Sequence, residues 1–201
     1  MITMKDFLSL PQEKQNKIIA SAMTLFADVG FKKTYVSEIA ASAGISEALI
    51  FSYFGCKKDL YSYLVDYTDK IIKTEAQSER DIVGMSFFER VITTIRFRLA
   101  IKSRFPAMNS FIESVHIEND EEVADDVDRL FDISKMLHLK VELEIGEETL
   151  LKKGVDPIQV VNLVDNYCDG ILLGWNHNIP LDDTMHNVKK CMDMLQANLF
   201  V

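Results

Sequence analysis

The chain has little of what secreted, metal-binding or membrane-embedded proteins need. Its three cysteines, Cys56, Cys168 and Cys191, lie far apart, so they form neither a disulfide framework nor a C-x-x-C motif, and we expect free thiols. No stretch approaches the roughly 18 consecutive apolar residues of a membrane-spanning helix. The start, MITMKDFLSLPQEK, has neither a basic leader nor an apolar signal core. We therefore expect a cytoplasmic protein with no membrane partner.

Glycine and proline are also scarce, with 8 and 4 among 201 residues, whereas 48% of the residues are apolar. This composition excludes a disordered chain and favours a folded, helical one. The net charge of −9 by itself argues against a nucleic-acid partner. Its distribution changes that conclusion, because the first 60 residues carry seven lysines and six acids, whereas the rest carry 15 basic and 25 acidic residues. Any nucleic-acid contact is therefore expected in the first 60 residues.

Apolar residues recur at helical spacing along most of the chain, and no convincing strand or repeat interrupts them. Capping signals mark several helix starts, among them Ser46, a Ser-x-x-Glu box at residues 86–89 and the pair Asp156-Pro157. Gly30 and Gly44 mark helix ends. The pattern predicts an all-α protein with helices over residues 12–29, 37–43, 46–54, 57–79, 86–103, 130–151, 157–175 and 184–200. Residues 107–117 are predicted to form a short element, and an interruption of the helix over residues 130–151 at Gly146 stays open.

The stretch AASAGISEALIFSYFGCKKDL, residues 40–60, joins two short helices through Gly44, which is the pattern of a helix-turn-helix. On the second helix Ile50, Tyr53 and Phe54 share one side and are expected in the core. The opposite side is free to touch a partner, and in helix-turn-helix proteins that partner is the DNA major groove. Periodicity alone is equally compatible with a small helical subdomain whose second face meets only solvent.

The segment FADVGFKKTYVSEIAASAGISEALIFSYFGCKKDLY resembles the N-terminal DNA-binding region of TetR-family transcriptional regulators, with the family pattern T-x-x-x-I-A-x-x-A-G-V-S-x-G-x-L-Y-x-Y-F-x-x-K-E-x-L. The matching positions are Thr34, Ile39, Ala40, Ala43, Gly44, Ser46, Tyr53, Phe54, Lys57 and Leu60. The resemblance implies an all-α protein with a helix-turn-helix DNA-binding domain over residues 1–56 and a helical bundle over residues 57–201 for effector binding and dimerisation. It further implies a homodimeric repressor. Its expected partners are double-stranded DNA with a palindromic operator sequence and a small-molecule effector.

The resemblance also carries over DNA contacts by position, namely Ser46, Glu47, Ala48, Leu49, Phe51, Ser52, Tyr53 and Lys57. Ser46 is expected to cap the helix and reach a phosphate, Ala48 to approach base edges, and Tyr53 with Lys57 to hold the backbone. Two residues depart from the family. Glu47 stands where lysine is frequent and Ser52 where a larger residue is common, which leaves the operator sequence open because a glutamate accepts from a cytosine amino group.

The second half offers two further expectations. Apolar positions on the last two helices predict a twofold four-helix interface through Val161, Val164, Leu172, Val188, Met192 and Leu195, with ordinary intramolecular core as the alternative. An aromatic and polar set predicts a mainly apolar cavity for an apolar or amphipathic effector, lined by Phe88, Phe97, Phe111, His116, Phe131, Met136, Asn166 and Tyr167. For each of these residues a place in the packed core is the competing interpretation.

Two other classes of protein compete with the regulator. An enzyme is disfavoured because the histidines His116, His138, His177 and His186 are scattered and no nucleophile and base have an interpretable spacing. We predict no catalytic residue, no metal site and no cofactor. A small-molecule-binding helical protein with weak or lost DNA binding stays open, because Glu47 removes a favourable contact to phosphate.

Overall fold

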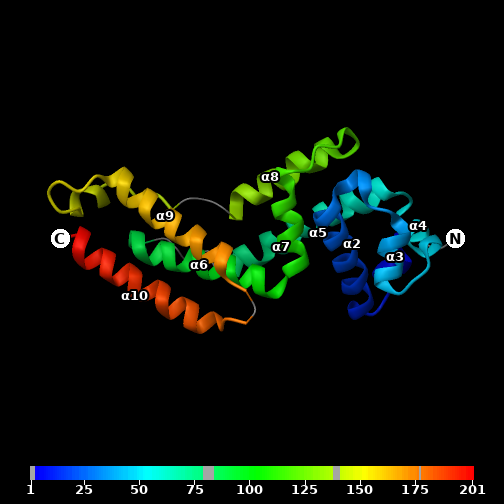
Figure 1. The fold of residues 1–201 in the computed structure, drawn as a ribbon, viewed down its shortest axis with the longest axis horizontal. Helices are drawn as coiled ribbons and strands as arrows, with labels where there is room; N and C mark the ends of the chain where they lie inside the picture. Colours follow the sequence, from blue (N-terminus) through cyan, green and yellow to red (C-terminus); the bar gives the residue numbers. More distant parts are fainter. Residues whose placement is uncertain (1–2, 79–83, 138–140, 177) are drawn as a thin grey trace. The chain divides into compact units, whose positions relative to one another are not determined.

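The structure, a computed structural model, describes residues 3–78, 84–137, 141–176 and 178–201, without the side chains of residues 77, 78 and 136 (Figure 1). The described residues form helices and no named strand, which confirms the predicted all-α fold. In chain order the helices are α1 (Met4–Leu8), α2 (Gln12–Lys33), α3 (Val36–Ala43), α4 (Glu47–Phe54), α5 (Lys57–Ser78), α6 (Phe87–Arg104), α7 (Pro106–Glu113), η1 (Ser114–His116), η2 (Glu121–Val123), α8 (Ala124–Leu137), η3 (Glu147–Leu150), α9 (Pro157–Gly174) and α10 (Leu181–Leu199). None of the helices in these ranges is long and apolar enough to cross a membrane.

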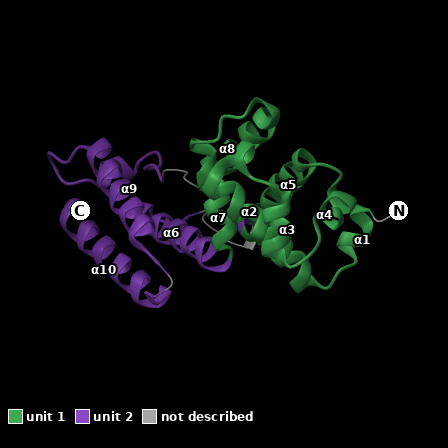
Figure 2. Ribbon diagram, turned by 45° about the vertical axis from the view of Figure 1, so that its right-hand side comes forward, with its two compact units in different colours: residues 1–75, 105–138 green, residues 76–104, 139–201 purple. Residues whose placement is uncertain are grey.

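The chain forms two compact units, and each draws on two segments of the sequence (Figure 2). Unit 1 comprises residues 1–75 and 105–138, and unit 2 comprises residues 76–104 and 139–201. Unit 1 therefore adds α7 and α8 to the N-terminal helices. This compactness is a property of packing, and the functional boundary after residue 56 stays a prediction.

An aromatic cluster holds unit 1 together. The rings of Phe26 and Phe31 from α2 stack with centroids 5.9 Å apart, and Tyr61 of α5 meets Phe26 edge-on at 5.1 Å. Phe111 of α7 meets Tyr61 at 5.1 Å. Gly30 makes this possible, because its φ of +80° kinks α2 three residues before its end and turns Phe31 back onto the preceding helical turns, as its position predicts. Burial raises the pKa of the Tyr61 phenol, and the nearby carboxylates of Glu118 and Asp126 raise it further.

A second tie holds the end of α2 to the turn after η1. The Glu118 carboxylate accepts the backbone N–H of Phe31 at 2.6 Å, and its other oxygen accepts those of Asn119 and Asp120 at 2.9 and 3.0 Å. Charge-assisted bonds of this kind are stronger than neutral ones. The segment that leads from α2 into α3 is therefore fixed by a residue 87 positions later in the chain.

No helix is predicted over residues 4–8, yet α1 completes the core of the N-terminal helices. Phe7 is fully buried. Its ring lies 4.9 Å from that of Phe54, 5.8 Å from Tyr53 and 5.6 Å from Tyr63. The short helix thus anchors the end of α4 to the start of α5.

Unit 2 packs α6, α9 and α10 around one apolar core. α6 lies closer against α10 than against α9. The core residues are Phe87, Phe88, Val91, Ile95, Leu99, Val160, Val164, Cys168, Leu172, Trp175, Met185, Val188 and Met192. One isolated antiparallel bridge, Leu151 with Phe200, ties the segment before α9 to the end of α10.

The predicted helix over residues 130–151 is wrong in its position. α8 begins earlier, at Ala124, and ends at Leu137, and residues 141–146 are not helical. Val141 and Leu143 are half-buried against the unit 2 core while Glu142 and Glu144 are exposed, which is the two-residue alternation of an extended segment. Gly146, with φ at +96°, then turns the chain into η3. We call residues 141–151 the strap.

Candidate DNA-binding surface

The turn between α3 and α4 is built as the helix-turn-helix pattern requires. Gly44 adopts φ +75°, ψ +33°, a left-handed conformation that costs a glycine little, and the N–H of Ile45 bonds to the carbonyl of Ala40 at 3.0 Å. Ser46 then caps α4, its Oγ accepting the N–H of Leu49 at 3.4 Å. Ile50 on α4 and Ile39 on α3 are fully buried at this junction. The two short helices are therefore held in a defined relation to each other.

One face of α4 is exposed, and it is the face that the spacing predicts. Glu47, Ala48 and Ser52 are exposed, and the Phe51 ring is 41% exposed although it is large and apolar. The Ser52 hydroxyl donates to the carbonyl of Ala48 at 2.7 Å, so it turns along the helix rather than away from it. Ser46 is exposed as well, and Leu49 and Tyr53 are half-buried. The structure thus brings seven of the eight residues expected to contact DNA together on α4 and its cap.

The eighth, Lys57, has partners within the chain. Its Nζ donates to the carbonyl of Phe31 at 2.9 Å and to that of Thr34 at 3.2 Å, and it lies 4.3 Å from the centre of the Phe31 ring. A cation in the first turn of a helix opposes the helix dipole. In this structure carbonyl groups at the end of α2 supply the compensating interaction that a phosphate was expected to supply. A lysine has three donors, so the ammonium has capacity for one more acceptor.

Several other polar groups on α2, on α3 and between them were not singled out from the sequence. Tyr35 at the start of α3 is 67% exposed, and Lys32, Lys33 and Ser37 are also exposed. Lys17 places its Nζ 3.3 Å from where a side chain at Gly44 would begin. The Lys-Lys pair after Gly30 was a visible signal, whereas the place of Lys17 depends on the packing of α2 against α3.

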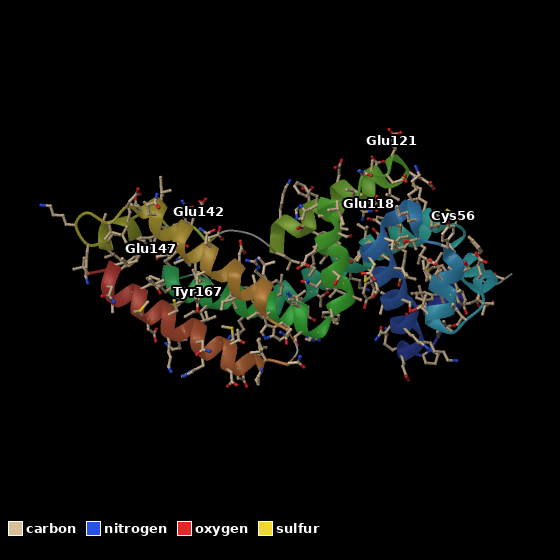
Figure 3. All side chains as sticks on the ribbon, viewed as in Figure 1. Cys56, Glu118, Glu121, Glu142, Glu147 and Tyr167 are labelled. Atoms are coloured by element: carbon tan, nitrogen blue, oxygen red, sulfur yellow. The ribbon has the colours of Figure 1, made fainter. Side chains whose placement is uncertain are left out.

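The residues predicted to line an effector cavity are divided between the two units. Phe111, His116 and Phe131 belong to unit 1, where His116 is exposed and meets the Phe131 ring edge-on at 5.8 Å. Phe88, Phe97, Asn166 and Tyr167 belong to unit 2, where Phe88 is buried, Asn166 exposed and the others half-buried. Figure 3 labels Tyr167 among the side chains of this unit. The Met136 side chain, like His138 and His177, lies outside the described residues. Burial raises the pKa of the Tyr167 phenol to about 12, and its neighbour Cys191 adds to the effect.

The structure has a hollow in unit 1 and a small cavity in unit 2. A hollow of about 420 Å³ in unit 1 lies beside Phe26, Lys32, Ser114 and Glu118, but the Glu118 carboxylate is committed to the three N–H groups described above. A cavity of about 20 Å³ in unit 2 is lined by Val91, Thr94, Ile95, Arg98, Val141, Val164, Asp165 and Cys168. None of the predicted cavity residues lines the second one.

All six residues predicted at the dimer interface belong to unit 2, and the interface stays a prediction. Val164, Leu172, Val188 and Met192 are buried within a single chain. Val161 and Leu195 are half-buried. The apolar residues of α9 and α10 lie on both an inner and an outer face of these helices. Their spacing in the sequence does not distinguish the two faces. In the described ranges no group of three or more His, Cys, Asp or Glu side chains is placed to hold a metal ion.

Comparison with known proteins agrees with this geometry. Residues 18–64 match the family model described as bacterial regulatory proteins, tetR family. IcaR of Staphylococcus aureus, a negative transcriptional regulator of the icaADBC biofilm operon, is 37% identical over 62 residues, 29% of this chain and 33% of IcaR. The chain covers no more than a third of the length of the curated relatives it matches.

Solved structures share the fold of the whole chain. The ketosteroid regulator KstR2 of Mycobacterium tuberculosis has a TM-score of 0.66 at 14% identity, covering 96% of this chain and 97% of KstR2. AibR, solved with isovaleryl coenzyme A and operator DNA, has a TM-score of 0.55 at 17% identity, covering 90% of this chain and 97% of AibR. Residues 18–64 therefore carry the N-terminal region of TetR-family regulators, and the chain along its length shares the fold of these solved regulators.

Proposed function

We propose that the protein is a dimeric, ligand-responsive repressor that binds a palindromic operator and is released from it by a small apolar or amphipathic effector. The observation that carries the proposal is the exposed face of α4, held at a capped glycine turn. Residues 1–56 would form the DNA-binding domain and residues 57–201 the effector and dimerisation domain. The sign of regulation follows IcaR, which is a negative regulator.

The exposed face of α4 suits the floor of a major groove. Ala48 is small enough for a close approach, and Phe51 offers an apolar ring of the kind that contacts the thymine methyl group. Glu47 would accept a hydrogen bond from a cytosine amino group. Phosphate contacts would come from exposed cations of the N-terminal helices, Lys32, Lys33 and Lys58, and from the spare donor of Lys57.

The outer face of α9 supports the proposed dimer. Gln159, Leu163, Asn166, Gly170 and Leu173 follow one another at steps of four and three residues, the spacing of a helix-packing seam. We call this set the α9 stripe. Leu163 is 51% exposed and Leu173 is 82% exposed, and nothing lies within 4 Å of a side chain built at Gly170. Two copies of the stripe related by a twofold axis would bury these leucines. Binding to successive major grooves separately requires two α4 helices about 34–36 Å apart.

We assign effector binding to unit 2. Release of DNA by the effector requires that the effector site and the DNA-binding surface are energetically coupled. A ligand weakens operator binding only when it binds one arrangement of the DNA-binding helices better than another. Coupling free energies in such systems are typically about 1–3 kcal/mol. AibR, which has this fold, was solved with an acyl coenzyme A and operator DNA, which supports a regulator that responds to a small molecule.

The test is selection of bound sequences from a pool of random duplexes, followed by titration of the enriched duplex. Enrichment of palindromes is expected. Ala48→Glu should abolish specific binding, because it adds a second carboxylate to the groove face, whereas Ala124→Glu is the matched control at an exposed helical position of the same unit. If no sequence is enriched, or both variants bind as the wild type does, the protein is instead a small-molecule-binding helical protein without operator recognition.

A further inference from the structure

Two arginines lie buried on α6 and differ in how many acceptors they meet. Arg90 is 5% exposed and Arg98, about two turns further along, is 9% exposed. A guanidinium carries five N–H donors and stays charged at every pH that a folded protein survives. Burying one is costly unless acceptors surround it.

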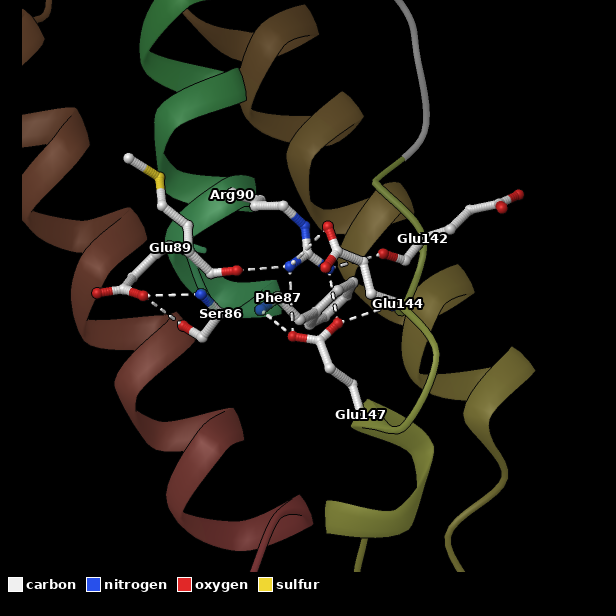
Figure 4. Close-up of polar contacts among 8 residues, drawn as sticks. Ser86, Phe87, Glu89, Arg90, Glu142, Glu144 and Glu147 are labelled. Carbon is white, nitrogen blue, oxygen red and sulfur yellow. Dashed lines mark hydrogen bonds and ion pairs between the residues drawn. The ribbon is translucent and has the colours of Figure 1, made fainter. Parts of the chain in front are cut away.

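Arg90 has those acceptors (Figure 4). Its Nη1 donates to the Met85 carbonyl at 2.6 Å, and its Nη2 donates to the Glu142 carbonyl at 3.0 Å. The Glu147 carboxylate pairs with both, at 3.3 Å to Nη1 and 2.6 Å to Nη2. Arg90 is thus a structural residue that fastens the strap to the start of α6.

Arg98 meets a single acceptor among the residues that the structure describes. Its Nη2 donates to Asp169 Oδ1 at 3.1 Å, and the Asp169 side chain is itself 50% exposed. An aspartate that reaches solvent can turn away at little cost, because water replaces the hydrogen bond that it gives up. The guanidinium has no such alternative, since it is nine-tenths buried.

The surroundings of Arg98 suit an amphipathic anion. Arg98 lines the cavity of about 20 Å³ together with Thr94, the half-buried Asp165 and the apolar side chains of Val91, Ile95 and Val164. This space holds about one water molecule, so a larger ligand must part the helices around it. α9 packs less closely on α6 than α10 does, and α6 and α9 supply most of the lining. Parting α6 from α9 would open an apolar slot with a cation in its wall.

We propose that Arg98 is the anion-recognition residue of the effector site, and that the effector carries a carboxylate on an apolar chain. The carboxylate takes the place of Asp169 on the guanidinium, and the chain lies between α6 and α9 beside Val91, Ile95 and Val164. This inference rests on the proposed function, since it names the ligand class of the effector site in unit 2.

The test uses straight-chain carboxylates of four to ten carbons and primary amides of equal length, each titrated calorimetrically into the full-length protein. A hydrogen-bonded charge pair contributes enough to favour the carboxylate roughly 10- to 100-fold over its amide. Arg98→Met should remove that preference. Arg96→Met is the matched control, because Arg96 is exposed on the same helix, and it should keep the preference. Arg98→Lys keeps the charge and should retain only part of the preference, which preserves the test if Arg98→Met does not fold.

Three outcomes would overturn the assignment. If carboxylates bind no more tightly than amides at any chain length, the site does not recognise an anion. If carboxylates still bind more tightly than amides in both Arg98→Met and Arg98→Lys, Arg98 is not the residue that recognises the anion. Preferential binding of octylamine would instead assign the site to a cation held by Asp165 and Asp169. The proposed function fails in a different way, since a carboxylate that binds through Arg98 but leaves operator affinity unchanged would preserve the site and exclude its effector role.

Discussion

The pairing of Glu147 with Arg90 makes a sharp prediction about what holds unit 2 together. Glu147 reaches back from η3 to the start of α6, where its carboxylate accepts from Arg90 and from the backbone N–H groups of Phe87 and Glu144 at 2.7 and 2.8 Å. Its side chain is 17% exposed and that of Arg90 is 6% exposed. Glu147→Gln keeps the size and one carbonyl oxygen but removes the charge.

The expected cost follows from this geometry. Removing one partner of a fully buried ion pair costs about 3–5 kcal/mol, because the other charge stays buried and unpaired. Here the carboxylate is partly exposed, the glutamine retains an acceptor, and the carbonyls of Met85 and Glu142 still bind Arg90. We therefore expect the free energy of unfolding of unit 2 to fall by about 2–3 kcal/mol.

The effect should depend on pH in one direction. Partial burial acts to raise the pKa of the Glu147 carboxyl, but the hydrogen bonds from Arg90, Glu144 and Phe87 outweigh it and lower that pKa below its ordinary value. A lowered pKa in the folded state means that the stabilisation is fully present above the unfolded value of about 4.3 and is lost as pH falls through the folded pKa. The wild type and Glu147→Gln should therefore converge in stability in acid.

Urea unfolding at neutral pH, read by circular dichroism, measures the difference, and hydrogen exchange of the strap reports local opening. Glu144→Gln is the matched control, because the Glu144 side chain also faces Arg90, at 3.5 Å, but is 66% exposed. An exposed pair contributes little, so Glu144→Gln should change stability by less than about 0.5 kcal/mol. Equal effects of the two substitutions at neutral pH would refute the reasoning from burial.

Three further changes test other contacts. Lys57→Met should lower the stability of unit 1 by about 1 kcal/mol. It should also reduce the slope of log K against log salt concentration for operator binding by about 0.9. Lys58→Met, at an exposed position, should leave stability unchanged, and equal stabilities of the two variants would contradict the contacts of Lys57 with the carbonyls. Tyr61→Phe should leave thermal stability unchanged or raise it by up to about 1 kcal/mol, because the buried hydroxyl has no partner in the described ranges. Leu173→Glu should yield monomers by light scattering, whereas Leu150→Glu, 52% exposed and outside the α9 stripe, should not; a dimeric Leu173→Glu would exclude that stripe.

Local signals were enough for the helix-turn-helix. Gly44 and Ser46 act within one turn of their own positions, through a left-handed conformation and a cap, so their effect is readable from neighbours in sequence. The same is true of Asp156, whose side chain accepts the N–H of Ile158 at 2.9 Å at the start of α9. The strap was misread because the alternation of Val141 and Leu143 was taken as part of a helix, although a period of two residues was present in the sequence.

Contacts between distant segments were not readable in this way. Lys57 looked free for a phosphate until the fold placed carbonyls of Phe31 and Thr34 beside it. Arg90 and Arg98 are both arginines of α6, and the distant strap supplies Arg90 with the Glu142 carbonyl and the Glu147 carboxylate as acceptors. Val164 and Leu173 are both apolar residues of α9, yet one is 3% and the other 82% exposed.

By itself, then, the sequence determined the all-α class, the turn, the caps and the outward face of α4, because these depend on interactions within a few residues. The tertiary structure decided which cations are engaged, which face of α9 is outside, and which of the two buried arginines meets more acceptors among the described residues. Those properties depend on which distant segment supplies a neighbour, as Glu118 does for Phe31 and Glu147 for Arg90. A one-dimensional pattern reports how polar a position is, and it does not contain the identity of the group that will lie against it.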